Sequence, residues 1–147
     1  MAKNIENIEE VNAETGEAKE RKVFKPSVYS TIDMNIPQNR IKLFNAHNSA
    51  TSLKDIGETP FNIVGVMAEE GERSNSKNPC QNTYIFTDDG TVLFSQSNGI
   101  AKTINELVAL IDSKFAENTT NGYVTARVKS TDIGGNRTYK NIELLDM

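Results

Sequence analysis

The sequence lacks several of the residues that catalytic and metal sites need. Its 147 residues include one cysteine, Cys80, and one histidine, His47. A single cysteine excludes a disulfide within the chain, and one cysteine with one histidine cannot form a Cys/His zinc site. Glycine-rich phosphate loops, Gly-x-Ser-x-Gly and His-Glu-x-x-His motifs are also absent. The sequence therefore gives an enzyme, a metal or a cofactor no support, although it leaves open catalytic groups that converge only in space.

Long apolar runs and an excess of basic charge are also missing. No run is long enough to span a membrane and residues 1–6 contain no apolar signal segment, so we expect a cytoplasmic protein without membrane contact. The net charge is −4, and all of this excess lies in residues 1–20, which have six glutamates and two lysines. Residues 21–147 are neutral overall. A surface that binds anions must therefore come from the local arrangement of side chains.

The length fits one domain, preceded by an extension. We interpret residues 1–20 as a mobile acidic tail, residues 21–38 as a basic extended arm, and residues 39–147 as the folded domain. Ile5, Ile8 and Val11 have the spacing of a short amphipathic helix, but their apolar surface suffices for a helix only within a complex. The tail is either a solubilising leader or a segment for self-association or partner docking.

The stretch Arg40–Ala46 alternates apolar and basic residues with the period of a half-buried strand. The pattern predicts that Ile41 and Leu43 face the core. Arg40 and Lys42 then lie on the opposite face, with Phe44 nearby.

The rest of the domain is predicted to be mainly β. Residues 61–68 indicate a core strand with a bulge at Gly65, and the polar residues 69–81 indicate a long exposed loop. Asp88-Asp89-Gly90 joins two β-rich runs, which is a strong hairpin signal. A capping box of Thr103 and Glu106 begins the single predicted helix, whose apolar face is Ile104, Leu107, Val108, Ile111 and Phe115. Two further strands follow over residues 123–129 and 137–144.

Aromatic and basic residues recur together on predicted strand faces. Base stacking on an aromatic ring is worth about 1–3 kcal/mol per base, and cations follow the phosphates. Phenylalanine and tyrosine in strands equally often fill a core. The candidate DNA-binding residues are Arg40, Lys42, Phe44, Tyr84, Phe94, Tyr123, Arg127, Lys129, Arg137 and Tyr139.

These motifs resemble the single-stranded-DNA-binding protein of the small tailed phages that replicate linear DNA by protein priming, the phi-twenty-nine group. The likeness runs over about residues 40–145 and includes the segments Ile41–Ala46, Ser52–Lys54, Ile63–Ala68, Ile85–Gly90 and Ala101–Asp112. It implies a five-stranded OB-like barrel with one helix that coats displaced single strands in the cytoplasm of an infected bacterium.

The resemblance also bears on the stacking residues. Phe94 resembles one stacking tyrosine of the family. Around Glu70 and residues 74–80, where the family has other aromatics, this sequence has charged and small residues, so Tyr84, Tyr123 or Tyr139 would have to substitute. The partners we consider are single-stranded DNA, a second copy of the chain through residues 1–38, and a phage DNA polymerase.

Two other functions remain open from the sequence. A protein-interaction adaptor on a small β-barrel would use the acidic tail or the basic arm to dock a partner. A nucleotide-processing enzyme would have only Asp88, Asp89 and His47 as acid or base groups. We regard an Asp-Gly turn as the simpler explanation for the aspartates.

Overall fold

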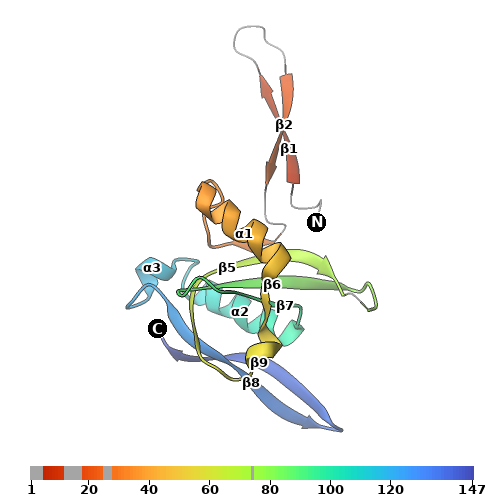
Figure 1. The fold of residues 1–147 in the computed structure, drawn as a ribbon, viewed down its shortest axis with the longest axis vertical. Helices are drawn as coiled ribbons and strands as arrows, with labels where there is room; N and C mark the ends of the chain where they lie inside the picture. The colour runs from red at the N-terminus through yellow and green to blue at the C-terminus, as the bar shows by residue number, and fades with distance from the viewer. Residues whose placement is uncertain (1–4, 12–17, 25–27, 74) are drawn as a thin grey trace.

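The structure is a computed structural model that describes residues 5–11, 18–24, 28–73 and 75–147 (Figure 1). The described part of the chain is mainly β. Its elements are, in order, β1 (Ile5–Val11), β2 (Ala18–Phe24), β3 (Tyr29–Ser30), α1 (Pro37–Ser49), β4 (Thr51–Ser52), the 3-10 helix η2 (Leu53–Ile56), β5 (Phe61–Glu72), β6 (Pro79–Thr87), β7 (Val92–Ser95), α2 (Asn98–Leu110), α3 (Phe115–Asn118), β8 (Val124–Gly134) and β9 (Arg137–Asp146).

The strands form two sheets. Strands β1 and β2 pair antiparallel in a sheet of their own, so Ile5, Ile8 and Val11 lie in a strand and not in a helix. The larger sheet has the order β4-β7-β6-β5-β8-β9, and β3 pairs with β5. Its neighbouring strands are antiparallel except for β4 and β7.

Residues 1–20 were predicted to be a mobile tail, and part of this segment lies outside the described residues. The predicted domain boundaries stay a prediction.

The larger sheet is strongly curled and surrounds α2 on its inner side (Figure 1). Gln81 on β6 bonds Asn105 on α2, while the backbone N–H of Ile142 on β9 donates to Thr103 Oγ1 of the same helix, at 3.1 Å in each case. The main core lies between this helix and the sheet. It includes Ile104, Leu107 and Val108 of α2, which confirms that part of the predicted apolar face. Ile111 and Phe115 are also in the core, but Ile111 is the C-cap of α2 and Phe115 lies on α3, so the prediction of one helix through Phe115 is wrong.

The capping box predicted at Thr103 is wrong. Helix α2 begins earlier, because Ser97 is its N-cap and accepts a hydrogen bond from the Ile100 N–H. Thr103 lies inside the helix, and its hydroxyl bonds the carbonyl oxygens of Gly99 and Ile100.

Helix α1 covers the opposite face of the sheet, and this corrects the prediction of a strand over Arg40–Ala46. Pro37 lies in the first turn, where a missing N–H costs nothing. The buried residues Leu43 and Ala46 are three apart, which is one helical turn, and they pack against Met67, Tyr84 and Phe86. The period-two alternation was therefore accidental. The prediction that α2 would be the only helix is also wrong.

The hairpin prediction is confirmed, because β6 and β7 pair antiparallel around residues 88–90. The bulge near Gly65 is confirmed by a register shift between Ile63 and Gly65. The predicted strands over 123–129 and 137–144 correspond to β8 and β9, which pair with each other. The prediction of a long exposed loop over residues 69–81 is wrong at both ends of that range, because β5 continues to Glu72 and β6 begins at Pro79. In addition, Glu69 is completely buried.

A matched pair of substitutions in α1 tests the helix. The Leu43 side chain is 3% exposed and that of Ile41 is 59% exposed, whereas a half-buried strand would place both in the core. Leu43→Ala is expected to lower the free energy of unfolding by about 2–5 kcal/mol, and Ile41→Ala by less than about 0.5 kcal/mol. Urea denaturation measures both. If both variants lost a similarly large free energy of unfolding, the result would contradict the helix and support the predicted strand.

Candidate nucleic-acid interface

Phe94 and Tyr84 form an aromatic pair on neighbouring strands. They are directly opposed residues of β7 and β6, and their ring centroids are 5.1 Å apart with an interplanar angle of 47°. Tyr84 is only 3% exposed, whereas Phe94 is half-buried. The Asp-Gly turn between the strands fixes this register. Of the two rings, Phe94 is the one that a ligand can reach.

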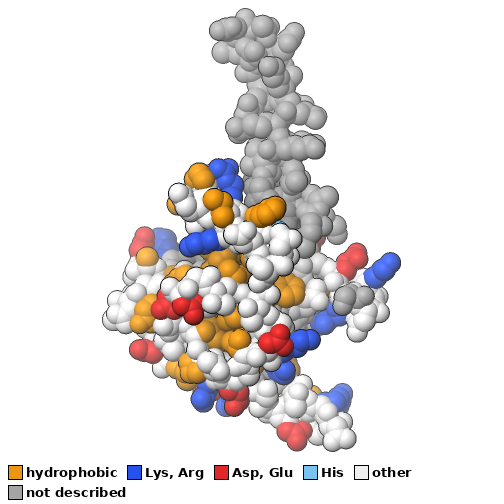
Figure 2. All heavy atoms as spheres, viewed as in Figure 1, with side chains coloured by type: hydrophobic (Ala, Val, Ile, Leu, Met, Phe, Trp, Pro, Cys, Tyr) orange, Lys and Arg blue, Asp and Glu red, His pale blue; other side chains and the backbone are white. Residues whose placement is uncertain are grey.

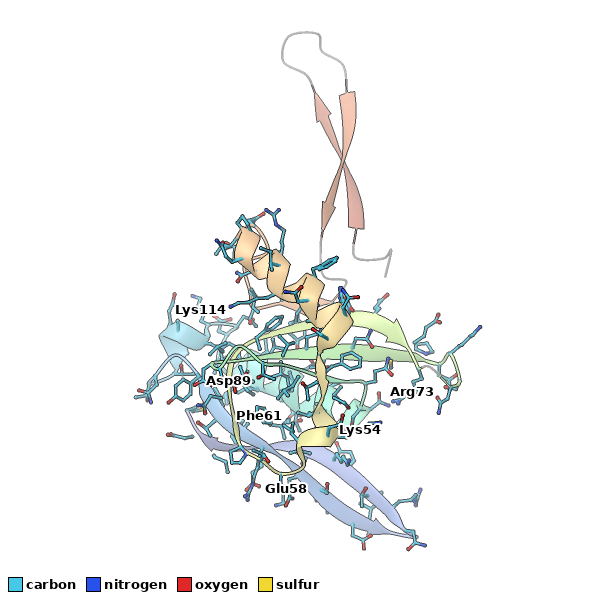
Figure 3. All side chains as sticks on the ribbon, in the orientation of Figure 1. Lys54, Glu58, Phe61, Arg73, Asp89 and Lys114 are labelled. Atoms are coloured by element: carbon cyan, nitrogen blue, oxygen red, sulfur yellow. The ribbon has the colours of Figure 1, made fainter. Side chains whose placement is uncertain are left out.

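A basic pocket of about 350 Å³ has Phe94 in its wall. We define it by its three cations, Lys54, Arg73 and Lys140, which line it together with Phe94. None of the described residues that line it is acidic. Lys54 and Arg73 lie on the same side of the molecule (Figure 3), and lysine and arginine side chains gather on that side of the surface (Figure 2).

Each cation of the basic pocket comes from a different segment. Lys54 lies on η2, and Arg73 follows β5, where its N–H donates to the Asn78 carbonyl oxygen and its own carbonyl accepts from the Lys77 N–H. Lys140 lies on β9, which packs directly on the first turn of α2. A Cβ atom at Gly99 would lie 2.2 Å from the Lys140 carbonyl oxygen. Glycine at this position therefore allows β9, and with it Lys140, to approach the helix.

A second, amide-lined pocket of about 530 Å³ also has Phe94 in its wall. Asn82 and Gln96 line it together with Tyr84, Phe94 and His47. The Gln96 side-chain amide donates to Asn82 Oδ1 at 2.9 Å and to the Glu72 carbonyl oxygen at 3.1 Å. The described lining also includes Glu70 and Glu72, and none of it is a lysine or an arginine. Phe94 and Gln96 are common to the two pockets.

A buried polar group lies beside the amide-lined pocket. Glu69 is fully buried, and its Oε1 is 3.2 Å from His47 Nε2 on α1. The His47 ring meets the edge of Tyr84 at 5.4 Å between centroids. Burial raises the pKa of the Tyr84 hydroxyl, and its hydrogen bond to the Glu69 carboxylate raises that pKa further. These contacts link α1 to the strand pair that carries Phe94.

The structure brings only two of the ten predicted site residues, Tyr84 and Phe94, to these pockets. Arg40, Lys42 and Phe44 are exposed on α1, and Lys42 lines a separate pocket. The other five lie on or next to the β8–β9 hairpin: Tyr123, Arg127, Lys129, Arg137 and Tyr139. All ten stay predictions as DNA contacts.

The predicted DNA-binding residues on the β8–β9 hairpin differ in whether their charge is already paired. Arg127 Nε is 3.1 Å from Glu143 Oε2, so its charge is paired within the protein. Lys129, Arg137 and Tyr139 are exposed.

Lys54, Arg73 and Lys140 were not among the predicted residues. Each stands alone in the sequence without the aromatic neighbour at even spacing that marked the other candidates. Lys140 is adjacent to Tyr139 but shares its strand face with the buried Ile142. Only the curl of the sheet brings the three cations to Phe94.

The candidate acid and base groups have structural partners. Asp89 Oδ1 accepts from the Thr87 hydroxyl at 2.6 Å and from the Thr91 N–H at 2.8 Å. These bonds, that of Thr87 first, lower the pKa of Asp89. The aspartate therefore closes the β6–β7 turn.

The described residues contain no group of three or more His, Cys, Asp or Glu that could hold a metal ion. Within the same residues, no helix has the length and apolar character that crossing a membrane requires.

A curled β-sheet that places an aromatic ring beside several cations is typical of proteins that bind single-stranded nucleic acid. A scan against protein families matches residues 18–134 to the phi29 family described as phage single-stranded DNA-binding protein. The match covers most of the sequence, and the chain belongs to this family. No curated protein and no solved structure matches the chain. The family binds DNA and is non-catalytic, in agreement with the resemblance seen in the sequence.

The contact between His47 and Glu69 can be tested through stability. His47→Ala removes the group that faces a fully buried carboxylate, and we expect the free energy of unfolding to fall by about 1–3 kcal/mol. Lys42→Ala, at an exposed site on the same helix, is the control and is expected to change stability by less than about 0.5 kcal/mol. Equal unfolding midpoints in urea for the two variants would show that the contact does not hold α1.

Proposed function

We propose that the chain binds single-stranded DNA without sequence preference, with a base stacked on Phe94 and phosphates held by Lys54, Arg73 and Lys140. The observation that carries this proposal is the position of Phe94, a reachable aromatic ring in the wall of a pocket with three cations. Stacking tolerates every base, and the cations contact only the backbone, so neither interaction selects a sequence. The family supports the class of ligand.

The fold is consistent with a divergent OB-like barrel. Among the described residues, five strands of the larger sheet have four residues or more, namely β5 to β9, and β3 and β4 have two residues each. OB folds bind oligonucleotides across one face of such a sheet. The chain then acts in the cytoplasm of an infected bacterium, where it covers single strands during replication of the phage DNA.

Other predicted residues can extend the DNA path beyond the two pockets. Lys129, Arg137 and Tyr139 are exposed on the β8–β9 hairpin, which also contributes Lys140 to the basic pocket. We assign them secondary contacts along this hairpin. Arg127 contributes less, because Glu143 already pairs with its charge. Arg40, Lys42 and Phe44 on α1 would require a longer path around the molecule. A contact with the phage DNA polymerase also stays a proposal, and we assign no part of the described surface to it.

Paired substitutions separate stacking from charge. Phe94→Leu keeps an apolar side chain against Tyr84 but removes the ring, and we expect oligo-dT affinity to fall about 5- to 150-fold with an unchanged salt dependence. Replacing Lys54, Arg73 and Lys140 together by alanine should instead reduce the slope of log affinity against log salt by about 2. Fluorescence titration at several salt concentrations measures both effects.

Lys114→Ala is the control for charge, because Lys114 lies on the other side of the molecule and pairs with Glu117 (Figure 3). It should leave affinity and slope unchanged. The proposal would be contradicted if the wild-type protein showed no salt-dependent binding, or if Phe94→Leu bound oligo-dT as tightly as the wild type.

The N-terminal extension is proposed to mediate self-association. Strands β1 and β2 pair only with each other among the described residues, and an isolated two-stranded hairpin is marginally stable in water. A second copy could complete this sheet by adding strands at its edges.

Deletion of residues 1–24 is the appropriate test of self-association. A deletion to residue 38 would also remove β3 and the Thr31 side chain, which accepts from the Val66 N–H in the main fold. We expect the shorter chain to have a lower mass by light scattering than the full chain while its far-ultraviolet circular dichroism stays that of a folded protein. The same number of subunits in both chains would refute the proposal.

A further inference from the structure

We propose that the amide-lined pocket holds the edge of one DNA base, whose face stacks on Phe94 while its phosphate lies over the basic pocket. This inference rests on the proposed function and adds a base-binding site to it. The two pockets share Phe94 and Gln96, so one nucleotide can reach both.

Volume and charge favour this orientation. The amide-lined pocket has about 530 Å³, within the range of pockets that hold small organic ligands. A nucleotide combines a neutral, polar base with an anionic phosphate. The three cations all line the basic pocket, whereas the described lining of the amide-lined pocket includes Glu70 and Glu72 and no lysine or arginine, so it disfavours a phosphate. The base therefore matches the amide-lined pocket, and the phosphate matches the basic pocket.

Two side-chain amides, those of Asn82 and Gln96, provide the polar groups that would meet a base in this pocket. The Gln96 NH₂ group donates to Asn82 Oδ1 and to the Glu72 carbonyl oxygen. Asn82 and Gln96 both line the pocket, so the Gln96 Oε1 atom and the Asn82 NH₂ group can supply an acceptor and a donor to a base. The pairing edge of every DNA base carries a donor next to an acceptor, and side-chain amides match such an edge. The pocket therefore accepts any base, as a protein without sequence preference requires.

Gly71 provides space for this arrangement. A Cβ atom there would lie 2.5 Å from both Asn82 Oδ1 and Nδ2, so the amide rests directly on the backbone of β5. Asn82 is a buried residue and cannot move aside freely. Gly71→Ala is therefore expected to displace the Asn82 amide from within the pocket, without a change in any charge.

The test compares two ligands of equal length, oligo-dT and an abasic deoxyribose-phosphate strand. Wild-type protein should bind oligo-dT at least tenfold more tightly than the abasic strand. Asn82→Leu and Gly71→Ala should each lose about 5- to 30-fold in affinity for oligo-dT, with an unchanged salt slope and wild-type affinity for the abasic strand. Lys54→Ala should weaken the binding of both ligands.

The outcomes separate this inference from the proposed function. If wild-type protein binds with salt dependence but Asn82→Leu and Gly71→Ala bind oligo-dT normally, or lose affinity for both ligands equally, the base pocket is refuted and DNA binding stands. If wild-type protein shows no salt-dependent binding, the proposed function itself fails. Should circular dichroism show that Asn82→Leu and Gly71→Ala are unfolded, Gln96→Met at a half-buried position supports or refutes the pocket by the same two criteria.

Discussion

The structure depends on the burial of strand β6 on both faces. Residues 82–87 are all buried. Ile85 contributes to the core around α2, whereas Tyr84 and Phe86 contribute to the cluster under α1. A shift of one residue in the register of β6 would exchange these two sets, so both cores oppose it. The position of Tyr84 against Phe94, and hence the position of the candidate stacking ring, follows from this constraint.

The packing of α1 on the outer face of the sheet combines apolar and polar contacts. Where α1 packs on the sheet, its apolar contribution is small, because only Leu43 and Ala46 of the helix are buried. The contact of His47 with Glu69 adds a polar attachment at the end of the helix nearest Phe94. Helix α1 forms part of the wall of the amide-lined pocket, because Ala46, His47 and Asn48 line it.

The sequence predicted the elements whose signals are local. The Asp-Gly turn, the bulge near Gly65 and the alternation in β8 and β9 depend on neighbouring residues, and these predictions agree with the structure. Helix α1 was missed because its two buried residues are one turn apart within a polar segment, and the apparent alternation was too short to decide. Pro37, a residue typical of a first helical turn, was the signal that favoured a helix.

The candidate site was only partly predictable for a different physical reason. Phe94 was identified through the resemblance, but Lys54, Arg73 and Lys140 come from three separate segments that no periodicity connects. Their proximity is a property of the curled sheet as a whole.

The contribution of β9 to the basic pocket lies beyond the part of the chain that the family match covers. The family match ends at residue 134, whereas Lys140 lies on β9, which begins at Arg137. One of the three cations therefore lies outside the matched segment. Under the proposed function, a change of charge at Lys140 would alter the salt dependence of DNA binding without any change in the segment that the family match covers.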